Sequence, residues 1–247
     1  RKIGFPVGLG KELHHLVVRE HAKASDAFHV LDIFKEFAHA IGVPAFDATW
    51  SIPISSRDQL AASALVHGEP GYALLAPSAS HSERIWMPER YAAVADYCHA
   101  KGFKVAVTGS AAPREMDLAS LICDLADSTL INVAGQTSLK ELLALCLHAR
   151  LVIGPDSGTL HMAITQRTPV VGLYAHSNPR RTGPYQGLQS VADAYTNILT
   201  SRGQQDRSEQ WGYRLKGEAL MREIQLETVT SLIDQALNQI YEARPFS

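Results

Sequence analysis

From residue 71 onward, short apolar runs alternate with longer stretches in which apolar residues recur every three or four positions. The short runs are typical of strands buried on both faces, and the longer stretches are typical of amphipathic helices. Regular alternation of this kind predicts a parallel sheet covered by helices on both sides, with about five strands in one doubly wound α/β domain. The predicted strands are Tyr72–Ala76, Lys104–Thr108, Ser128–Asn132, Leu151–Ile153 and Pro169–Leu173.

Residues that commonly start and stop helices mark the segments between these strands. Pro113 suits the first turn of a helix, Ser138 and Glu141 have the spacing of a capping box, and Gly102 follows the last periodic residue of its segment. The predicted helices are Pro88–Lys101, Pro113–Leu125, Ser138–His148 and one that begins at about Thr159.

The first 46 residues carry less pattern than a domain needs. They contain one expected strand, Lys2–Phe5, and one expected amphipathic helix, Phe28–Ile41, which Gly42 ends. Because the sequence opens at Arg1 on a strand, we expect a preceding segment that buries the apolar face of this helix, so that residues 1–46 are the remnant of an N-terminal domain. That face contains Val30, Phe34, Phe37 and Ile41.

Residues 47–70 contain prolines and little periodicity, which predicts a linker between two domains. Within it, Ser55 or Ser56 is expected to cap a short helix that ends near Val66. The domain over 71–225 includes an irregular stretch, 174–217, for which we expect surface loops and a short strand or turn near 189–199. Residues 226–247 are expected to add a C-terminal helix over Leu226–Ala243 with one apolar stripe.

Composition narrows the class of protein. The 247 residues are 46% hydrophobic, which allows a sizeable core, and a formal net charge of −2 gives no indication of a nucleic-acid partner. Cys98, Cys123 and Cys146 have neither disulfide nor metal spacing and lie within predicted helices. No apolar run reaches the ~18–20 residues of a membrane span, and no signal-peptide pattern is present. These features are typical of a protein of the reducing cytoplasm.

The stretch from Leu151 to Ala163 is the strongest chemical signal in the chain. It predicts a buried strand, a tight polar turn over Gly154–Gly158, and a helix that begins at Thr159. The first N–H groups of such a helix have no intrahelical partners and favour an anion in front of them. Asp156 or Ser157 would serve equally well as an ordinary helix cap, so the residues alone leave the two interpretations open.

Loops after the other predicted strands carry polar residues that would share the same edge of the sheet. Ser80 and Arg84 follow the first strand, and a guanidinium can hold a phosphate through two parallel hydrogen bonds. Glu115 follows the second strand, where a carboxylate can cap a helix or accept hydrogen bonds from a ribose diol. Each of these residues taken singly is more often a solvated or capping side chain.

The last two loops on this edge contribute three further candidates. Ser138 is most simply a helix cap, which leaves Thr137 to face a ligand. His161 lies one turn into the helix that follows Asp156, and a lone helical histidine is more often a packing residue than a ligand. Taken together, the loops suit a nucleotide with phosphates and a sugar.

The sequence lacks the motifs of several other classes of nucleotide-binding proteins and enzymes. No G-x-G-x-x-G follows a strand, and there is no G-x-x-x-x-G-K-[ST] or G-x-S-x-G, which disfavours dinucleotide reductases, P-loop nucleotidases and α/β-hydrolases. No Asp-x-Asp pair and no His/Cys cluster has the spacing that holds a metal ion, so we expect none at the site.

In this order and setting, the motifs resemble those of glycosyltransferase family 9, the ADP-heptose:lipopolysaccharide heptosyltransferases. The resemblance spans roughly residues 71–185, and its most specific element is Asp156-Ser-Gly-Thr-Leu-His161. The C-terminal helix and the residues before it also resemble the end of the family's sequences. The other matching motifs are 76–80, 84–91, 107–109 with Glu115, 135–139, 169–174, Asn178-Pro179 and 183–185.

The resemblance implies a GT-B architecture, in which two Rossmann-like domains face a cleft and this chain holds the complete C-terminal, donor-binding domain. It implies a metal-independent, inverting transfer of a sugar, heptose in this family, from a nucleotide-diphosphate donor such as ADP-heptose to a lipid-linked lipopolysaccharide core acceptor. It also implies that Ser80 and Arg84 contact the diphosphate, that Glu115 holds the ribose and that Thr137 flanks the base. The remaining site residues, which would line the phosphates and the sugar, are Asp156, Ser157, Gly158, Thr159 and His161.

Two departures qualify the resemblance. The family usually has Lys where Arg84 stands and often Gly where Ser78 stands, so the geometry around the donor differs. The family's general base is a carboxylate of the N-terminal domain, and the chain offers no candidate for it. The expected protein is a monomer without a cofactor, in the cytoplasm or at the cytoplasmic face of the inner membrane. A nucleotide-sugar epimerase of GT-B fold and a non-catalytic nucleotide-sugar-binding protein are the alternatives.

Overall fold

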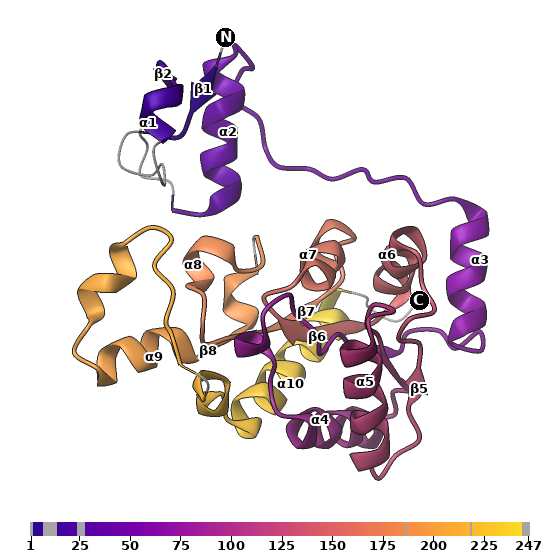
Figure 1. Cartoon of the computed structure of the whole chain (residues 1–247). Helices are drawn as coiled ribbons and strands as arrows, with labels where there is room; N and C mark the ends of the chain where they lie inside the picture. Colours follow the sequence, from indigo (N-terminus) through magenta and orange to yellow (C-terminus); the bar gives the residue numbers. More distant parts are fainter. Residues whose placement is uncertain (1, 7–13, 24–27, 186, 218, 244–247) are drawn as a thin grey trace.

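A parallel six-stranded sheet forms the centre of the larger part of the molecule (Figure 1). The computed structural model of the chain describes residues 2–6, 14–23, 28–185, 187–217 and 219–243. The strand order is β5-β4-β3-β6-β7-β8, so the chain builds outward from β3 in one direction and then returns to add β6 on its other side. The strands are β3 (Ala73–Leu75), β4 (Val105–Val107), β5 (Ile131–Asn132), β6 (Leu151–Pro155), β7 (Val170–Tyr174) and β8 (Val191–Asp193).

All five predicted strands are present, and the predicted α/β class with a parallel sheet is confirmed. The sixth strand, β8, lies where the sequence indicated only a short strand or turn. It pairs with β7 in parallel register, and Asp193 at its end caps α9 by accepting a hydrogen bond from Thr196 N at 2.9 Å. The helix that follows was not predicted, because only a few apolar residues mark it.

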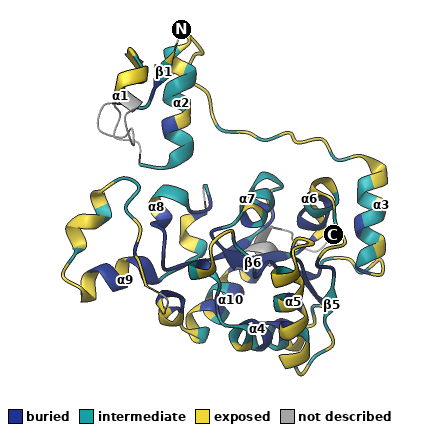
Figure 2. Cartoon of the chain, in the orientation of Figure 1, coloured by how far each residue is buried: buried dark blue, intermediate teal, exposed yellow. Residues whose placement is uncertain are grey.

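Helices cover both faces of the sheet (Figure 2), because neighbouring residues of each strand point to opposite sides. In β3, Ala73 and Leu75 pack with α4, α5 and α10, whereas Leu74 packs with α3, α6 and α7. Two apolar cores on either side of one sheet are the layered arrangement that the strand–helix alternation predicted. The helices are α3 (Ser56–Leu65), α4 (Pro88–Ala100), α5 (Pro113–Leu125), α6 (Leu139–His148), α7 (Gly158–Thr165), α8 (Pro179–Thr182), α9 (Ala194–Ser201) and α10 (Leu226–Ala243).

Helix starts follow the sequence signals closely. Ser138 caps α6 and forms the predicted capping box with Glu141, and Pro113 occupies the first turn of α5. Ser55 caps α3 through a second capping box. Helix α3 packs against α6 and places Ala62 and Val66 in a core of the sheet domain.

The C-terminal helix matches its prediction from Leu226 to Ala243. Val229, Ile233 and Leu237 of its apolar stripe are buried, and the side chain of Ile240 lies outside the described residues, as does the structure of 244–247. Short 3-10 helices connect several elements: η1 (Ser82–Arg84), η2 (Leu188–Ser190), η3 (Gln205–Glu209) and η4 (Leu220–Glu223).

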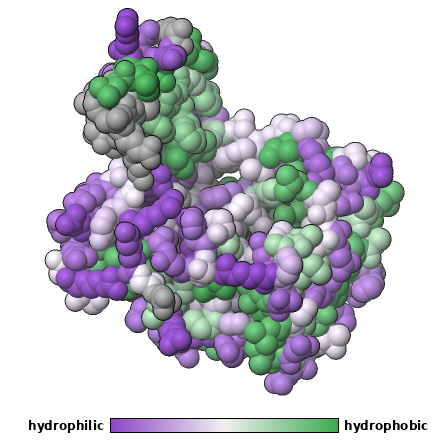
Figure 3. Space-filling view, in the orientation of Figure 1, coloured by the Kyte–Doolittle hydropathy of each residue, from purple (hydrophilic) through white to green (hydrophobic). Residues whose placement is uncertain are grey.

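The N-terminal part forms a small separate layer above the sheet domain (Figure 1). It contains a parallel pair of two-residue strands, β1 (Ile3–Gly4) and β2 (Glu20–His21), and the helices α1 (His14–Val17) and α2 (Val30–Ala40). The predicted apolar face of α2 is only partly covered, since Phe34 and Ile41 are 52% and 65% exposed. In Figure 3, hydrophobic surface accordingly gathers on this part of the molecule.

Tyr185, which follows α8, joins the two parts. Its hydroxyl donates a hydrogen bond to Asp32 Oδ1 at 2.6 Å and accepts one from Lys35 Nζ at 2.7 Å. The ring of His29 packs against it edge-on, with ring centroids 5.0 Å apart, and His29 Nε2 lies 3.0 Å from the carbonyl oxygen of Gly183. These contacts place the start of α2 directly beside α8.

Candidate functional site

The carboxyl ends of β3, β4 and β6 enclose a cleft of about 550 Å³. Since the strand order reverses between β3 and β6, the cleft lies at the switch point where open α/β sheets bind ligands. The structure brings all nine site residues predicted from the sequence to the lining of this cleft, while their binding roles stay predictions: Ser80, Arg84, Glu115, Thr137, Asp156, Ser157, Gly158, Thr159 and His161.

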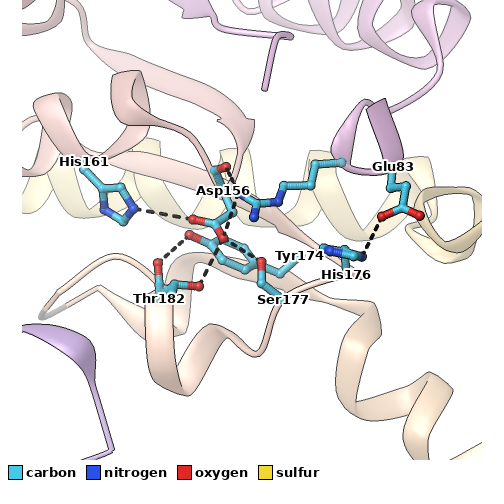
Figure 4. A network of polar contacts seen from close by, with 8 residues as sticks. Glu83, Asp156, His161, Tyr174, His176, Ser177 and Thr182 are labelled. Carbon is cyan, nitrogen blue, oxygen red and sulfur yellow. Dashed lines mark hydrogen bonds and ion pairs between the residues drawn. The ribbon is translucent and has the colours of Figure 1, made fainter. Parts of the chain in front are cut away.

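Asp156, which follows β6, is the centre of a polar network in this cleft (Figure 4). The residue is 8% exposed, and its Oδ2 accepts hydrogen bonds from Ser177 Oγ at 2.6 Å and from Thr182 Oγ1 at 3.1 Å. Arg84 Nη1 donates to the backbone oxygen of Asp156 at 3.1 Å and lies 3.5 Å from Oδ2. His161 Nε2 lies 3.5 Å from Oδ1 on the other side.

The network keeps Asp156 ionised despite its burial. Burial alone would raise the pKa of this carboxyl, but the contacts with His161 and Ser177 and the charge of Arg84 lower it below the usual value. Arg84, itself 9% exposed, therefore has a buried counter-charge that fixes the guanidinium against the cleft. A buried ion pair of this kind is costly to break, because removal of one partner leaves the other charge uncompensated.

This geometry corrects one sequence interpretation. Ser157 occupies the N-cap position of α7, but its side chain makes no capping hydrogen bond, and the Asp156 carboxylate turns toward Ser177 and Thr182 instead. Neither residue is the helix cap that their types suggested. The first N–H groups of α7 are thus left without a side-chain partner at the cleft.

Four polar atoms that line the cleft are buried and have no hydrogen-bond partner among the described residues. Buried polar groups are nearly always paired in folded proteins, because an unpaired donor costs about 1–3 kcal/mol. Their concentration in one cleft indicates that a polar ligand completes them. The atoms are Ser78 Oγ, Arg84 Nε, Thr108 Oγ1 and Ser157 Oγ.

Apolar side chains also line the cleft. Leu139 and Leu142 of α6 and Met162 of α7 belong to this lining together with Thr137, and Leu139 is 72% exposed. Glu115 lines the cleft as well, and its Oε2 accepts a hydrogen bond from the Ser110 backbone N–H at 2.8 Å. This hydrogen bond holds the loop before α5 in place.

Sequence reasoning missed the residues that hold Asp156 from below. Ser177 and Thr182 belong to the loop after β7 and to α8, within the stretch interpreted only as surface loops. The available signal was the position of Ser177 just past a predicted strand on the same edge. His176 beside it is 6% exposed, and its Nδ1 lies 3.6 Å from Glu83 Oε2.

The part of the chain that the structure describes contains neither a candidate metal site nor a candidate membrane span. Among those residues, no group of three or more His, Cys, Asp or Glu side chains could hold a metal ion. In the same ranges, no helix combines the length and the apolar character needed to cross a bilayer.

The family profile of glycosyltransferase family 9 (heptosyltransferase) matches residues 2–212. The chain belongs to this family. Lipopolysaccharide core heptosyltransferase OpsX of Haemophilus influenzae is 39% identical over 229 residues, which cover 92% of the chain and 66% of that protein. Lipopolysaccharide heptosyltransferase 3 of Escherichia coli is 31% identical over 146 residues, covering 57% of the chain and 42% of its own length. The chain thus spans about two thirds or less of these family 9 relatives.

Solved structures agree with the family 9 assignment at the level of the fold. A glycosyltransferase family 9 protein from Veillonella parvula superposes with a TM-score of 0.72 at 23% identity, covering 92% of the chain and 65% of that protein. E. coli ADP-heptose LPS heptosyltransferase II superposes with a TM-score of 0.67 at 17% identity, covering 96% and 70%. The GT-B type predicted for the sheet domain is confirmed by these neighbours.

Proposed function

We propose that this chain provides the donor site of a glycosyltransferase that transfers heptose from ADP-heptose to a lipopolysaccharide core acceptor. Family 9 membership and the 39% identity to a lipopolysaccharide core heptosyltransferase support transfer to a core acceptor. The observation that carries the donor assignment is the set of unpartnered polar atoms around the free N-terminus of α7. That combination is suited to a diphosphate.

In the proposed reaction, the acceptor oxygen forms a bond to the anomeric carbon of the donor sugar while the bond from that carbon to the phosphate oxygen breaks. The configuration inverts, and the acceptor proton passes to a base that is not among the nine site residues. Negative charge accumulates on the departing diphosphate. The α7 N–H groups, Ser157 and Arg84, which line the cleft, would stabilise it without a metal ion, which is electrostatic catalysis by preorganised donors.

The apolar part of the lining suggests the orientation of the nucleotide. Leu139, Leu142 and Met162 suit the base, together with Thr137. Glu115 would accept hydrogen bonds from the ribose, because its Oε1 is not used by the Ser110 contact. The sugar would then lie near His161, whose side chain is 45% exposed on the far side of Asp156.

The remaining expectations for the whole protein belong to the same proposal. A lipid-linked core acceptor would bring the enzyme to the cytoplasmic face of the inner membrane through peripheral contact. The enzyme would act as a monomer, and the nucleotide-sugar would be a substrate, so that no cofactor takes part.

Thermal denaturation with ADP tests the donor assignment. We expect ADP to raise the melting temperature of the chain and UDP to raise it less. Arg84→Gln should remove the ADP effect, because it takes the cation from the cleft. Arg180→Gln is the matched control, since Arg180 is exposed and pairs with Glu209 outside the cleft.

Absence of any shift with purine or pyrimidine diphosphates would refute the proposal. Product analysis with the donor separates the alternatives named above: an epimerase converts a nucleotide-sugar without an acceptor, and a binding protein leaves it unchanged. A transferase consumes the donor only when the acceptor is present.

A further inference from the structure

A second group of basic side chains lies near Arg84 and Asp156. Arg181 belongs to α8, five residues after His176. Arg214 is brought to the same place because it forms an isolated antiparallel bridge with Ser177, while Leu215 N donates to the His176 carbonyl oxygen at 3.0 Å. None of these side chains lines the nucleotide cleft. We call Arg181, Arg214 and His176 the α8 basic cluster.

Arg181 is the unusual member of this cluster. It is half-buried, its guanidinium carbon lies 4.2 Å from the ring centroid of Trp211, and its Nε is buried without a hydrogen-bond partner. Within the described ranges, no carboxylate lies at ion-pair distance from it. The adjacent Arg180 is different, since it is exposed and forms an ion pair with Glu209.

The charges around Arg181 are unbalanced. Burial lowers its pKa, and the nearby charges of Arg214 and Arg84 lower it further, against the attraction of Asp156. The Asp156 carboxylate is already shared among Arg84, Ser177 and Thr182. Three guanidinium groups thus repel one another around a single buried carboxylate. An additional anion would reduce this repulsion.

His176 adds an unused polar atom to the same place. Its Nδ1 is buried and has no hydrogen-bond partner among the residues that the structure describes, and Glu83 Oε2 lies 3.6 Å away on a side chain that is 41% exposed. In Figure 4, the Glu83–His176 pair and His161 lie on opposite sides of Asp156. The Asp156 network therefore separates His176 from His161.

The N-terminal part borders this cluster. Trp211 Nε1, on the ring that stacks with Arg181, donates to the Phe28 carbonyl oxygen at 3.1 Å, and Arg180 lies over the Phe28 ring. A ligand that reached Arg181 would therefore approach between α2 and α8. The donor diphosphate already has the α7 N-terminus and Arg84, so the anion at Arg181 belongs to a different molecule.

We propose that Arg181 and Arg214, with His176, form a second anion subsite that holds a phosphate or carboxylate substituent of the acceptor next to the donor diphosphate. The assignment to an acceptor rests on the proposed glycosyl transfer, whereas the subsite itself rests on the unpaired groups. Arg181 provides the pre-oriented fork, since stacking on Trp211 fixes its plane.

Calorimetric titration of inorganic phosphate into the chain saturated with ADP tests the subsite. We expect phosphate to bind the ADP complex, and Arg181→Gln to weaken that binding at least tenfold while the Kd for ADP changes less than twofold. Arg214→Gln should weaken phosphate binding severalfold. Arg180→Gln, the neighbouring arginine with its own acidic partner, should leave both affinities unchanged. Titration with acetate in the same design reports whether the subsite takes a carboxylate.

Three results would overturn the proposal. Phosphate that competes with ADP would show that the cleft is the sole anion site. Arg181→Gln that weakens ADP as strongly as Arg84→Gln would place Arg181 in the donor site. Failure of both phosphate and acetate to bind the ADP complex would leave no subsite. If the unaltered chain does not bind ADP, that result contradicts the donor assignment alone, because phosphate is then titrated into the chain without ADP and the effect of Arg181→Gln on that binding still tests the subsite. If Arg181→Gln does not fold, Arg214→Gln, at an exposed position, provides the test of phosphate binding in its place.

Discussion

Two segments of very different regularity meet at Asp156. The segment from β6 to α7 supplies His161 and Ser157 from a strand–turn–helix unit with a clear apolar pattern. The segment from the end of β7 to α8 supplies Ser177 and Thr182 from a loop and a single helical turn. The first faces the cleft for which we propose a nucleotide, and the second supports the carboxylate and carries the α8 basic cluster.

The two segments differ in what their hydroxyl groups do: one hydroxyl is free for a ligand, and two hold the Asp156 carboxylate. On the α7 side, Ser157 leaves its hydroxyl without a protein partner, which is consistent with a group kept for a ligand. On the α8 side, the hydroxyls of Ser177 and Thr182 are used to hold Asp156. Loss of the Ser157 hydroxyl should therefore affect ligand affinity first, and loss of the Ser177 or Thr182 hydroxyl should affect stability first.

Asp156→Ala should have the largest effect, because it removes the residue that both segments share. Arg84 would be left as a buried charge without a partner, and two hydroxyls would lose their acceptor, at a cost of about 3–5 kcal/mol in the free energy of unfolding. Urea denaturation measures this cost. Asp206→Ala, at an exposed position, is the control and should change stability by less than about 0.5 kcal/mol. A loss below about 1 kcal/mol for Asp156→Ala would mean that the network is not structural.

Ser177→Ala and Ser157→Ala form the direct comparison between the two sides. Ser177→Ala removes a 2.6 Å hydrogen bond to a buried carboxylate and should cost about 1.5–3 kcal/mol of stability. Ser157→Ala breaks no hydrogen bond within the protein and should leave the urea midpoint nearly unchanged while it weakens ADP binding severalfold. Equal stability losses in the two variants would contradict the assignment of Ser157 to ligand binding and of Ser177 to the support of Asp156.

Much of the sheet domain was predictable because each strand and helix is marked by residues close together in the sequence. The strands around Leu74 and Val152 are apolar on both faces, and Ser138 with Glu141 forms a capping box that is recognisable from four residues. The nine residues predicted for the site could be expected to line one cleft because each follows a predicted strand, and all parallel strands end at one edge.

The support around Asp156 could not be predicted in the same way. Thr182 reaches Asp156 only because Gly183 and Pro179 close α8 into a tight turn, where a Cβ on Gly183 would lie 2.4 Å from the Pro179 carbonyl oxygen. The charge balance around Arg181 depends on the Ser177–Arg214 bridge, which joins segments 37 residues apart in a stretch without periodicity. Contacts of this kind are set by tertiary packing.

Gly154→Ala and Gly158→Ala compare the strand and the helix start of the α7 side. A Cβ on Gly154 would lie 2.5 Å from the Ala76 backbone oxygen, so this variant should lose about 1–3 kcal/mol of stability through overpacking in the sheet. A Cβ on Gly158 would meet no atom within 4 Å, so that variant should fold normally. If a diphosphate approaches the α7 backbone, Gly158→Ala should still weaken ADP binding. Melting curves with and without ADP measure both effects, and unchanged ADP affinity in Gly158→Ala would place the phosphates elsewhere.

The smallest expected effect is a pH dependence of stability that originates on the α8 side. Burial lowers the pKa of His176, and the charges of Arg84 and Arg214 lower it further against the attraction of Glu83. In the unfolded chain the group titrates near its ordinary value of about 6.5, so between that value and the lowered one the unfolded state binds more protons. Stability should therefore fall as the pH drops from about 7.5 to 5.5.

His176→Gln should flatten that dependence without removing it, because burial also lowers the pKa of His29 at the start of α2. Urea denaturation at three pH values gives the slope for each variant, and His148→Gln, at an exposed position on α6, should leave it unchanged. Bound phosphate should also reduce the slope in the unaltered chain, since an anion beside His176 favours its protonated form and raises its pKa toward the unfolded value. A slope that phosphate leaves unchanged, in a chain shown to bind it, would place the anion away from His176 and confine the subsite to Arg181 and Arg214.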